Sequence, residues 1–271
     1  MADGELSWIP PGVDITKPSA ARVYDYYLGG ACNLQVDREF AKQVLAVLPE
    51  ARDFARLNRA FLHRAVRWLA RQGVRQFIDI GSGVPTVGHT HEIAQSVDPS
   101  CRVVYVDNEP VAVAHSELLL ADNDRTTVLH ADLRDPDAVL RSPTTRELID
   151  FDQPVAVMML ALLHFVPDTD DPSGIIGRYR SAMAPGSYLV LSHATDEGVG
   201  QRTERAASMY KNTTNPANLR TRARITELFA GFDILEPGVV FTPQWRPESD
   251  ADAEDPERAL ALAAVGRKIG D

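Results

Sequence analysis

The chain has little cysteine and no long hydrophobic run. Its 271 residues contain two cysteines, Cys32 and Cys101, which are too few and too far apart for a disulfide framework or a metal cluster. No apolar stretch approaches the roughly 20 residues that a membrane-spanning helix needs. Residues 1–17 are polar and rich in proline and glycine, unlike a secretory signal peptide. These absences predict a cytoplasmic protein with no membrane partner.

The chain also lacks an excess of positive charge. With 28 Lys and Arg against 38 Asp and Glu, its formal net charge is −10. Proteins that bind the phosphate backbone of nucleic acids neutralise it with clusters of Lys and Arg. The composition therefore argues against a nucleic-acid partner.

From residue 75 onward, apolar strands alternate with helices. Hydrophobic residues make up 44% of the chain, which is enough to form the core of one domain. Apolar runs predict strands at 76–80, 102–106, 126–130, 154–160 and 187–192, and the segments after them predict helices at 90–97, 110–121, 136–149 and 173–183. This order is typical of a Rossmann-like α/β fold with a mostly parallel sheet. A helix at 221–230 and strands at 232–241 and 259–267 complete a seven-stranded sheet, whose last strand we expect to be antiparallel.

Residues 1–50 are predicted to form an N-terminal helical extension, or lid, on a main domain at 51–271. A short helix at 19–28 ends at the pair Gly29-Gly30. Its aromatic residues either pack onto the domain or cover a cationic ligand; they are Tyr24, Tyr26 and Tyr27.

A further helical stretch within the first 75 residues has one apolar and one basic face. The apolar residues recur at spacings of three and four: Phe54, Leu57, Phe61, Ala65 and Trp68. The opposite face carries Arg52, Arg56, Arg59, His63, Arg67 and Arg71. We interpret the basic face as solvated, with a surface for an anionic partner as the alternative.

Three of the predicted strands deliver an acid at their carboxyl ends. Asp79 precedes a glycine turn, and Asp107 and Asp132 follow the next two apolar runs. Because parallel strands end at the same edge of a sheet, these acids describe a nucleoside-binding edge. The alternative for each acid alone is that it caps the helix that follows.

The glycine turn departs from the dinucleotide pattern G-x-G-x-x-G. Gly81 and Gly83 are present, but the third glycine position is Thr86, and Pro85 has no N–H to offer a phosphate. A ligand without phosphate loses little by this change, and S-adenosyl-L-methionine is such a ligand.

On this hypothesis each acid has a role. Asp79 binds the ammonium group of the amino-acid tail, Asp107 accepts from the ribose hydroxyls, and Asp132 accepts from the adenine amino group beside the Leu133 backbone. The predicted cofactor contacts also include Gly81, Ser82, Gly83, Asn108 and Ala161 at the sheet edge, and Arg22 and Tyr26 on the lid.

These segments resemble the class I S-adenosylmethionine-dependent methyltransferases, over roughly residues 50–270, and within them an actinobacterial subfamily long catalogued as a domain of unknown function. The segments that carry the resemblance are Ser19–Gly30, Phe77–Thr86, Val104–Pro110, Ala131–Asp135, Leu163–Asp168, Ala184–Val190 and Trp245–Pro247. One departure from the superfamily turn is Pro85, which stands two positions after Gly83 in place of a glycine. The resemblance implies S-adenosyl-L-methionine as the cofactor and methyl transfer as the reaction.

Methyl transfer from a sulfonium needs alignment, and needs a base only if the acceptor loses a proton. His164 and His193 follow predicted strands and are the candidate catalytic bases, with a structural role as the alternative for each. The run from His91 to Gln95 lacks the second histidine of a zinc helix, so we predict no metal site there.

The acceptor is expected to be a small molecule. The segment after the fourth strand lacks the Asp/Asn-Pro-Pro-aromatic tetrapeptide of amino-directed nucleic-acid methyltransferases, and the chain has no Pro-Cys pair. We expect residues 197–224 to cover the acceptor pocket, with substrate contacts at Met209, Tyr210, Lys211 and Arg220. The alternatives are a nicotinamide-dependent oxidoreductase and a binding or regulatory protein without turnover, and a homo-oligomer is left open.

Overall fold

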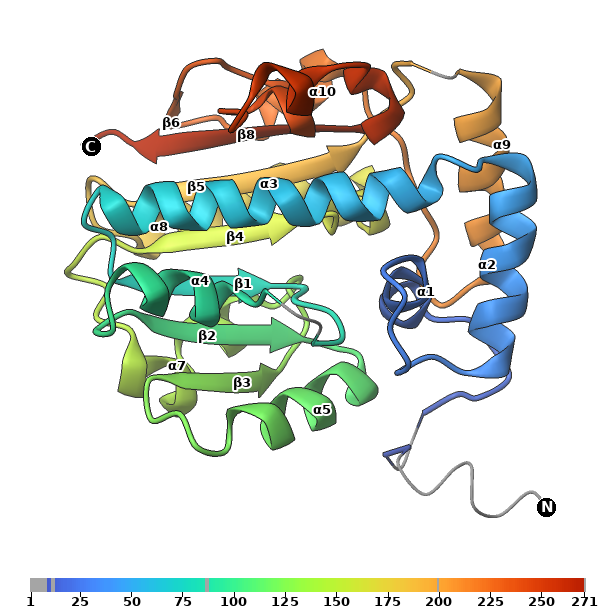
Figure 1. Ribbon diagram of the computed structural model, residues 1–271. Helices are drawn as coiled ribbons and strands as arrows, with labels where there is room; N and C mark the ends of the chain where they lie inside the picture. The colour runs from blue at the N-terminus through green and yellow to red at the C-terminus, as the bar shows by residue number, and fades with distance from the viewer. Residues whose placement is uncertain (1–8, 11–12, 86–87, 199, 271) are drawn as a thin grey trace.

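A central sheet organises the computed structural model, which describes residues 9–10, 13–85, 88–198 and 200–270 (Figure 1). The strand order is β3-β2-β1-β4-β5-β8-β6, with β7 also paired to β8. The strands are β1 (Gln76–Ile80), β2 (Arg102–Asp107), β3 (Thr126–His130), β4 (Ala156–Leu160), β5 (Tyr188–Ala194), β6 (Phe232–Ile234), β7 (Val240–Phe241) and β8 (Ala261–Lys268). Strands β1 to β5 are parallel, and β8 runs antiparallel to β5. This confirms the predicted α/β class with a mostly parallel sheet.

The helices connect the strands and cover both faces of the sheet. They are α1 (Ala20–Tyr27), α2 (Gln35–Val47), α3 (Ala51–Arg71), α4 (Thr90–Val97), α5 (Pro110–Leu120), α6 (Pro136–Leu140), α7 (Pro143–Leu148), α8 (Pro172–Ala182), α9 (Gln201–Met209) and α10 (Arg222–Glu227). Short 3-10 turns follow β4 at Leu163–Phe165 and Asp168–Asp170, follow α9 at Tyr210–Asn212, and occur at Thr242–Gln244, Asp250–Ala253 and Pro256–Ala259. No helix of the described chain is long and apolar enough to cross a membrane.

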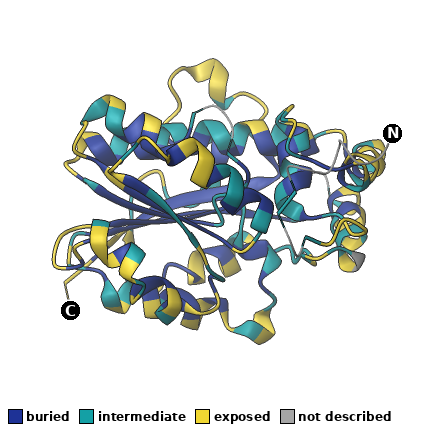
Figure 2. Cartoon of the chain, turned by 90° about the horizontal axis from the view of Figure 1, so that it is seen from below, coloured by how far each residue is buried: buried dark blue, intermediate teal, exposed yellow. Residues whose placement is uncertain are grey.

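Alternate residues of each strand enter two different cores. Ile78 and Ile80 belong to a cluster with residues of α8 and α10, whereas Phe77 belongs to a cluster with α3 and α4. The strands are consequently buried on both faces, as the dark blue sheet between two helical layers shows (Figure 2).

Two predicted elements are divided in the structure. The predicted strand at 232–241 forms β6 and β7, because Pro237 has no N–H for the ladder and Gly238 turns the chain with φ 90°. The sheet therefore has eight strands. The predicted helix at 136–149 forms α6 and α7, and α7 begins at Pro143, which cannot continue a preceding helix.

The basic face of α3 is only partly solvated. Arg52, Arg56 and Arg71 are exposed, as predicted. Two other residues of this face contact distant parts of the chain. His63 Nε2 lies 3.1 Å from the carbonyl oxygen of Gly88, and Arg67 forms an ion pair with Glu248.

The N-terminal helices are positioned beyond the carboxyl ends of the parallel strands. There α1 and α2 gather with α9 at one end of the molecule (Figure 1). Val23 and Tyr27 of α1 are buried in a shared apolar cluster with Val44 of α2, Ala55 of α3 and Ala206 of α9. The fold thus closes the strand ends with helices from two distant parts of the chain.

Candidate cofactor and acceptor site

A cavity of about 810 Å³ lies at the carboxyl ends of the strands. Its wall includes the glycine turn at 80–83 and the segments that follow β2, β3 and β4. Helices α1, α2 and α3 and the segment at 203–219 supply most of the remaining wall. The cavity therefore brings together the sheet edge and both predicted covers.

The glycine turn folds back onto the end of β2. The amides of Gly81 and Ser82 donate to the carbonyl oxygen of Val106 at 2.7 and 3.3 Å, and the amide of Gly83 donates to Asp107 Oδ2 at 2.7 Å. Gly81 and Gly83 both have φ 69°, which a residue with a side chain rarely adopts. The turn amides that would cradle a pyrophosphate are thus bonded within the chain.

The N-terminus of α4 is likewise occupied by its own carboxylate. Glu92 Oε2 accepts from the amides of Gly88 and His89, each at 2.9 Å. An acid at this position interacts favourably with the helix dipole and fills the site where a phosphate would bind. This agrees with a ligand that carries no phosphate.

Asp107 holds two segments together at the end of β2. Besides Gly83, it accepts from the amide of Glu109 through Oδ1 at 2.8 Å. Burial raises the pKa of the Asp107 carboxyl to about 6, and the hydrogen bonds from the two amides oppose that rise.

Asp79 is buried at the end of β1. Its Oδ2 accepts a 2.6 Å hydrogen bond from Thr90 Oγ1, at the first residue of α4. Burial raises the pKa of Asp79 to about 6, against the effects of this hydrogen bond and of the Arg59 charge.

Asp132 has a partner that the sequence did not reveal. Arg134 binds both of its oxygens, with Nε at 2.9 Å from Oδ1 and Nη2 at 2.6 Å from Oδ2. Asn108 Nδ2 also donates to Oδ2 at 3.1 Å. These bonds, chiefly that from Arg134, lower the pKa of Asp132 to about 2, so this carboxylate is ionised.

A second group missed from the sequence is Asn58, on the face of α3 toward the cavity. Ser192 Oγ donates to Asn58 Oδ1 at 2.5 Å, and Asn58 Nδ2 donates to Tyr24 Oη at 3.0 Å. The amide of Ala161 donates to Ser192 Oγ at 2.9 Å, and Ala161 itself has φ 50°. This chain of hydrogen bonds joins the end of β4 to helix α1.

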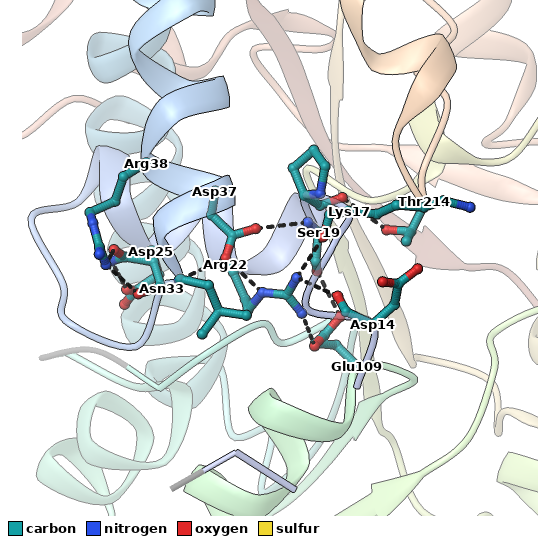
Figure 3. A network of polar contacts seen from close by, with 12 residues as sticks. Asp14, Lys17, Ser19, Arg22, Asp25, Asn33, Asp37, Arg38, Glu109 and Thr214 are labelled. Atoms are coloured by element: carbon teal, nitrogen blue, oxygen red, sulfur yellow. Dashed lines mark hydrogen bonds and ion pairs between the residues drawn. The ribbon is translucent and has the colours of Figure 1, made fainter. Parts of the chain in front are cut away.

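Arg22 is buried in a polar network that fastens α1 to the sheet edge (Figure 3). Its Nε donates to Asp37 Oδ2 and its Nη1 donates to Glu109 Oε1, both at 2.7 Å. Ser19 Oγ donates to Glu109 Oε2 at 2.7 Å. Arg22 lines the cavity, but these bonds make it a link between the lid and the residue two positions after Asp107. Tyr26 is placed outside the cavity wall, to which α1 contributes Tyr24 and Tyr27.

The two predicted catalytic histidines differ in their surroundings. His164 lines the cavity, whereas His193 is fully buried with both ring nitrogens engaged. His193 Nδ1 lies 2.6 Å from the Ala194 carbonyl oxygen, and Arg220 Nη1 lies 2.7 Å from His193 Nε2. Both ring nitrogens of His193 have partners within the chain, which favours the structural role that the sequence left as its alternative.

Arg220 also lies outside the cavity wall and bonds to the segments behind it. Its guanidinium donates to the carbonyl oxygens of Leu163 and Val166, each at 2.8 Å, and pairs with Asp168 at 2.6 Å. Because these bonds hold the segment that carries His164, Arg220 stabilises the wall and does not face an acceptor.

Of the other expected substrate contacts, Tyr210 lines the cavity, whereas Met209 and Lys211 lie outside its wall. The Tyr210 hydroxyl lies 3.4 Å from the Tyr27 hydroxyl of α1. The lid and the segment at 197–224 therefore touch across the cavity.

Comparison with known proteins gives the family. A model of the S-adenosyl methyltransferase family matches residues 7–269. The chain belongs to this family. Membership confirms the prediction from the glycine and acid motifs, and S-adenosyl-L-methionine is the cofactor.

Two solved structures are similar over nearly their full length. A methyltransferase candidate from Thermobifida fusca YX is 42% identical, with a TM-score of 0.91, and the match covers 97% of this chain and 100% of that one. A DUF574 family protein from Streptomyces avermitilis MA-4680 is 40% identical, with a TM-score of 0.90 and coverage of 94% and 99%. Human N-acetylserotonin methyltransferase, solved with its cofactor, shares the fold at 15% identity and a TM-score of 0.52, over 91% of this chain and 62% of that one. Curated proteins gave no match.

The residues at the sheet edge fit this cofactor. A Cβ added at Gly83 would meet no atom within 4 Å, so the backbone there borders open space. Ser82 Oγ is buried without a hydrogen-bond partner in the described chain, which leaves a polar group available to a ligand. Asp79 and Asp107 offer carboxylates to an ammonium group and to hydroxyls.

Cofactor binding is expected to weaken as the pH falls. With pKa values near 6, Asp79 and Asp107 are ionised at neutral pH and protonated in acid, and only the carboxylate form accepts fully from an ammonium or hydroxyl group. Calorimetry should show that S-adenosylhomocysteine binds at least about tenfold more weakly near pH 5 than near pH 7.5. The Asp79→Asn variant should bind weakly at both pH values, with a smaller dependence. An affinity independent of pH in the unmodified protein would contradict these roles.

Proposed function

We propose that this methyltransferase-family protein transfers the methyl group to a small, largely apolar acceptor inside the cavity. The observation that carries the proposal is the continuity of one cavity from the acidic sheet edge to a wall of aromatic and aliphatic residues. That wall includes Tyr27, Val44, Leu48, Phe54, Phe165, Ala206, Ala207, Tyr210 and Leu260.

The distribution of charge supports an uncharged acceptor. Within the described chain, α2, α9 and the segment at 210–219 contribute no charged side chain to the cavity wall. The charged lining residues come from the N-terminal segment, from Arg59, and from the carboxyl ends of the strands and the segments that follow them. Burial of a charge without a partner is unfavourable, so an ionic acceptor is disfavoured at the apolar end.

Enclosure by two segments supports chemistry on a small molecule. The amide of Ala20 donates to Asn215 Oδ1 at 3.3 Å, and the Phe40 ring packs edge-on against Tyr210 with centroids 5.0 Å apart. We propose that residues 13–50 and 200–224, within the described parts of these two segments, together form a roof that excludes water from the reacting groups.

S-adenosyl-L-methionine supplies a methyl group on a sulfonium, whose thioether leaving group needs no acid. The protein then has to align the acceptor and, for a hydroxyl or amine acceptor, handle one proton. His164 is the group on the cavity wall suited to contact the acceptor atom.

The surroundings of His164 favour a hydrogen-bond donor over a base. The amide of Ala194 donates to His164 Nδ1 at 3.5 Å, which places the hydrogen of the neutral ring on Nε2. Burial lowers the pKa of the ring well below its ordinary value, so the imidazole is neutral and weakly basic. We propose that Nε2–H orients the acceptor.

The function is tested by incubating the protein with methyl-labelled S-adenosylmethionine and a small-molecule extract of actinobacterial cells. The label should pass to an uncharged compound of low mass that partitions into organic solvent. A protein that binds S-adenosylhomocysteine but transfers no label would support a binding or regulatory role. Label in polypeptide or nucleic acid, offered in parallel, would contradict a small acceptor.

The role of His164 is tested with two substitutions, once an acceptor is known. His164→Gln retains a side-chain N–H donor and should keep most of the kcat, whereas His164→Ala should lose about tenfold or more. Equal and complete loss in both variants, together with loss of an acidic limb in the pH–rate profile, would show that His164 is a base instead.

A further inference from the structure

Arg59 differs from the other arginines on α3 because it lines the cavity and has a buried Nε without a hydrogen-bond partner in the described chain. Arg64 donates to the carbonyl oxygens of Trp245 and Thr242 at 3.0 and 2.6 Å, and Arg56 lies 3.9 Å from Asp53. Arg59 is half-buried, and its Nε is fully buried without a hydrogen bond. A buried donor left unpaired is unfavourable, which points to a ligand that satisfies it.

The position of Arg59 identifies the part of the cavity that it serves. It lines the cavity together with Asp79 and the glycine turn. Burial raises the pKa of Asp79 and the Arg59 charge opposes that rise, so the two groups are electrostatic neighbours. They nevertheless form no ion pair within 4.0 Å in the described structure. A guanidinium with an unsatisfied Nε and a carboxylate without an ion-pair partner in the described chain thus border the same end of the cavity.

We propose that the Arg59 guanidinium binds the α-carboxylate of the cofactor's amino-acid tail, opposite Asp79, which binds the α-ammonium. This assignment rests on S-adenosylmethionine as the cofactor. A carboxylate accepts several hydrogen bonds and matches the fork of a guanidinium, which makes such pairs short and strong. Asp79 and Arg59 then recognise the two charges of a zwitterion, one each.

The pairing has a consequence for ligand selectivity. A ligand with the ammonium but without the carboxylate would leave Arg59 Nε unsatisfied. The site should therefore discriminate between S-adenosylhomocysteine and its decarboxylated analogue, in which an aminopropyl group replaces the amino-acid tail. This discrimination should depend on Arg59 and on no other arginine of α3.

The test is a cycle of two ligands and two proteins measured by calorimetry. The unmodified protein should bind S-adenosylhomocysteine about 10- to 100-fold more tightly than the decarboxylated analogue. In Arg59→Met the preference should fall to within about twofold, because only the carboxylate-containing ligand loses a partner. Arg56→Met, one turn away and exposed, is the matched control and should leave both affinities unchanged.

Two results would contradict the proposal, each in a different way. If Arg59→Met weakens both ligands equally, Arg59 supports the fold of the site and the proposal is overturned. If the preference survives in a variant that melts like the unmodified protein, the carboxylate is bound elsewhere. Arg59→Lys provides a second variant in case Arg59→Met does not fold. It retains the charge without the fork and should show an intermediate preference, and an unchanged preference would contradict the bidentate pairing.

Discussion

The hydrogen bonds that the Asp107 carboxylate accepts hold the segments of the site together. Its two oxygens accept from the amides of Gly83 and Glu109, so it fixes the glycine turn of β1 against the end of β2. Glu109 in turn accepts from Arg22, which also binds the fully buried Asp37 of α2. The N-terminal helices are therefore tied to the cofactor-binding edge through one continuous set of hydrogen bonds. Because Asp107 is already bound to the backbone, it is positioned before any ligand arrives, which lowers the entropic cost of binding.

Both apolar packing and buried polar contacts fasten helix α1 to the rest of the molecule. Helix α1 buries Val23 and Tyr27 in a cluster shared with α2, α3 and α9. Tyr24, which packs against the same cluster, continues the chain of hydrogen bonds from Asn58 and Ser192 to the end of β4. The hydroxyls of Tyr27 and Tyr210 lie 3.4 Å apart, so α1 and the segment after α9 meet beside the cavity.

The positions of the three acids were predictable from the sequence. Each acid ends or directly follows an apolar run, and the carboxyl ends of parallel strands lie at one edge of the sheet. Asp79, Asp107 and Asp132 all line the cavity, and α4 begins at Thr90 as expected. Residue partners were not predictable in the same way. Arg220 and His193 are 27 residues apart, and Arg22 and Glu109 are 87 apart, so no local pattern reveals that each pair is in contact. Helical periodicity predicts a solvated place for Arg59, because it does not show that this part of α3 borders the cavity.

A crystal structure with S-adenosylhomocysteine would show whether this sheet edge holds the cofactor and leaves the apolar end of the cavity to the acceptor. We expect the ribose hydroxyls on Asp107, the amino-acid tail between Asp79 and Arg59, and the sulfur facing the space near His164 and Tyr210. A ligand bound outside this cavity, or with its sulfur directed away from the apolar wall, would contradict this expectation.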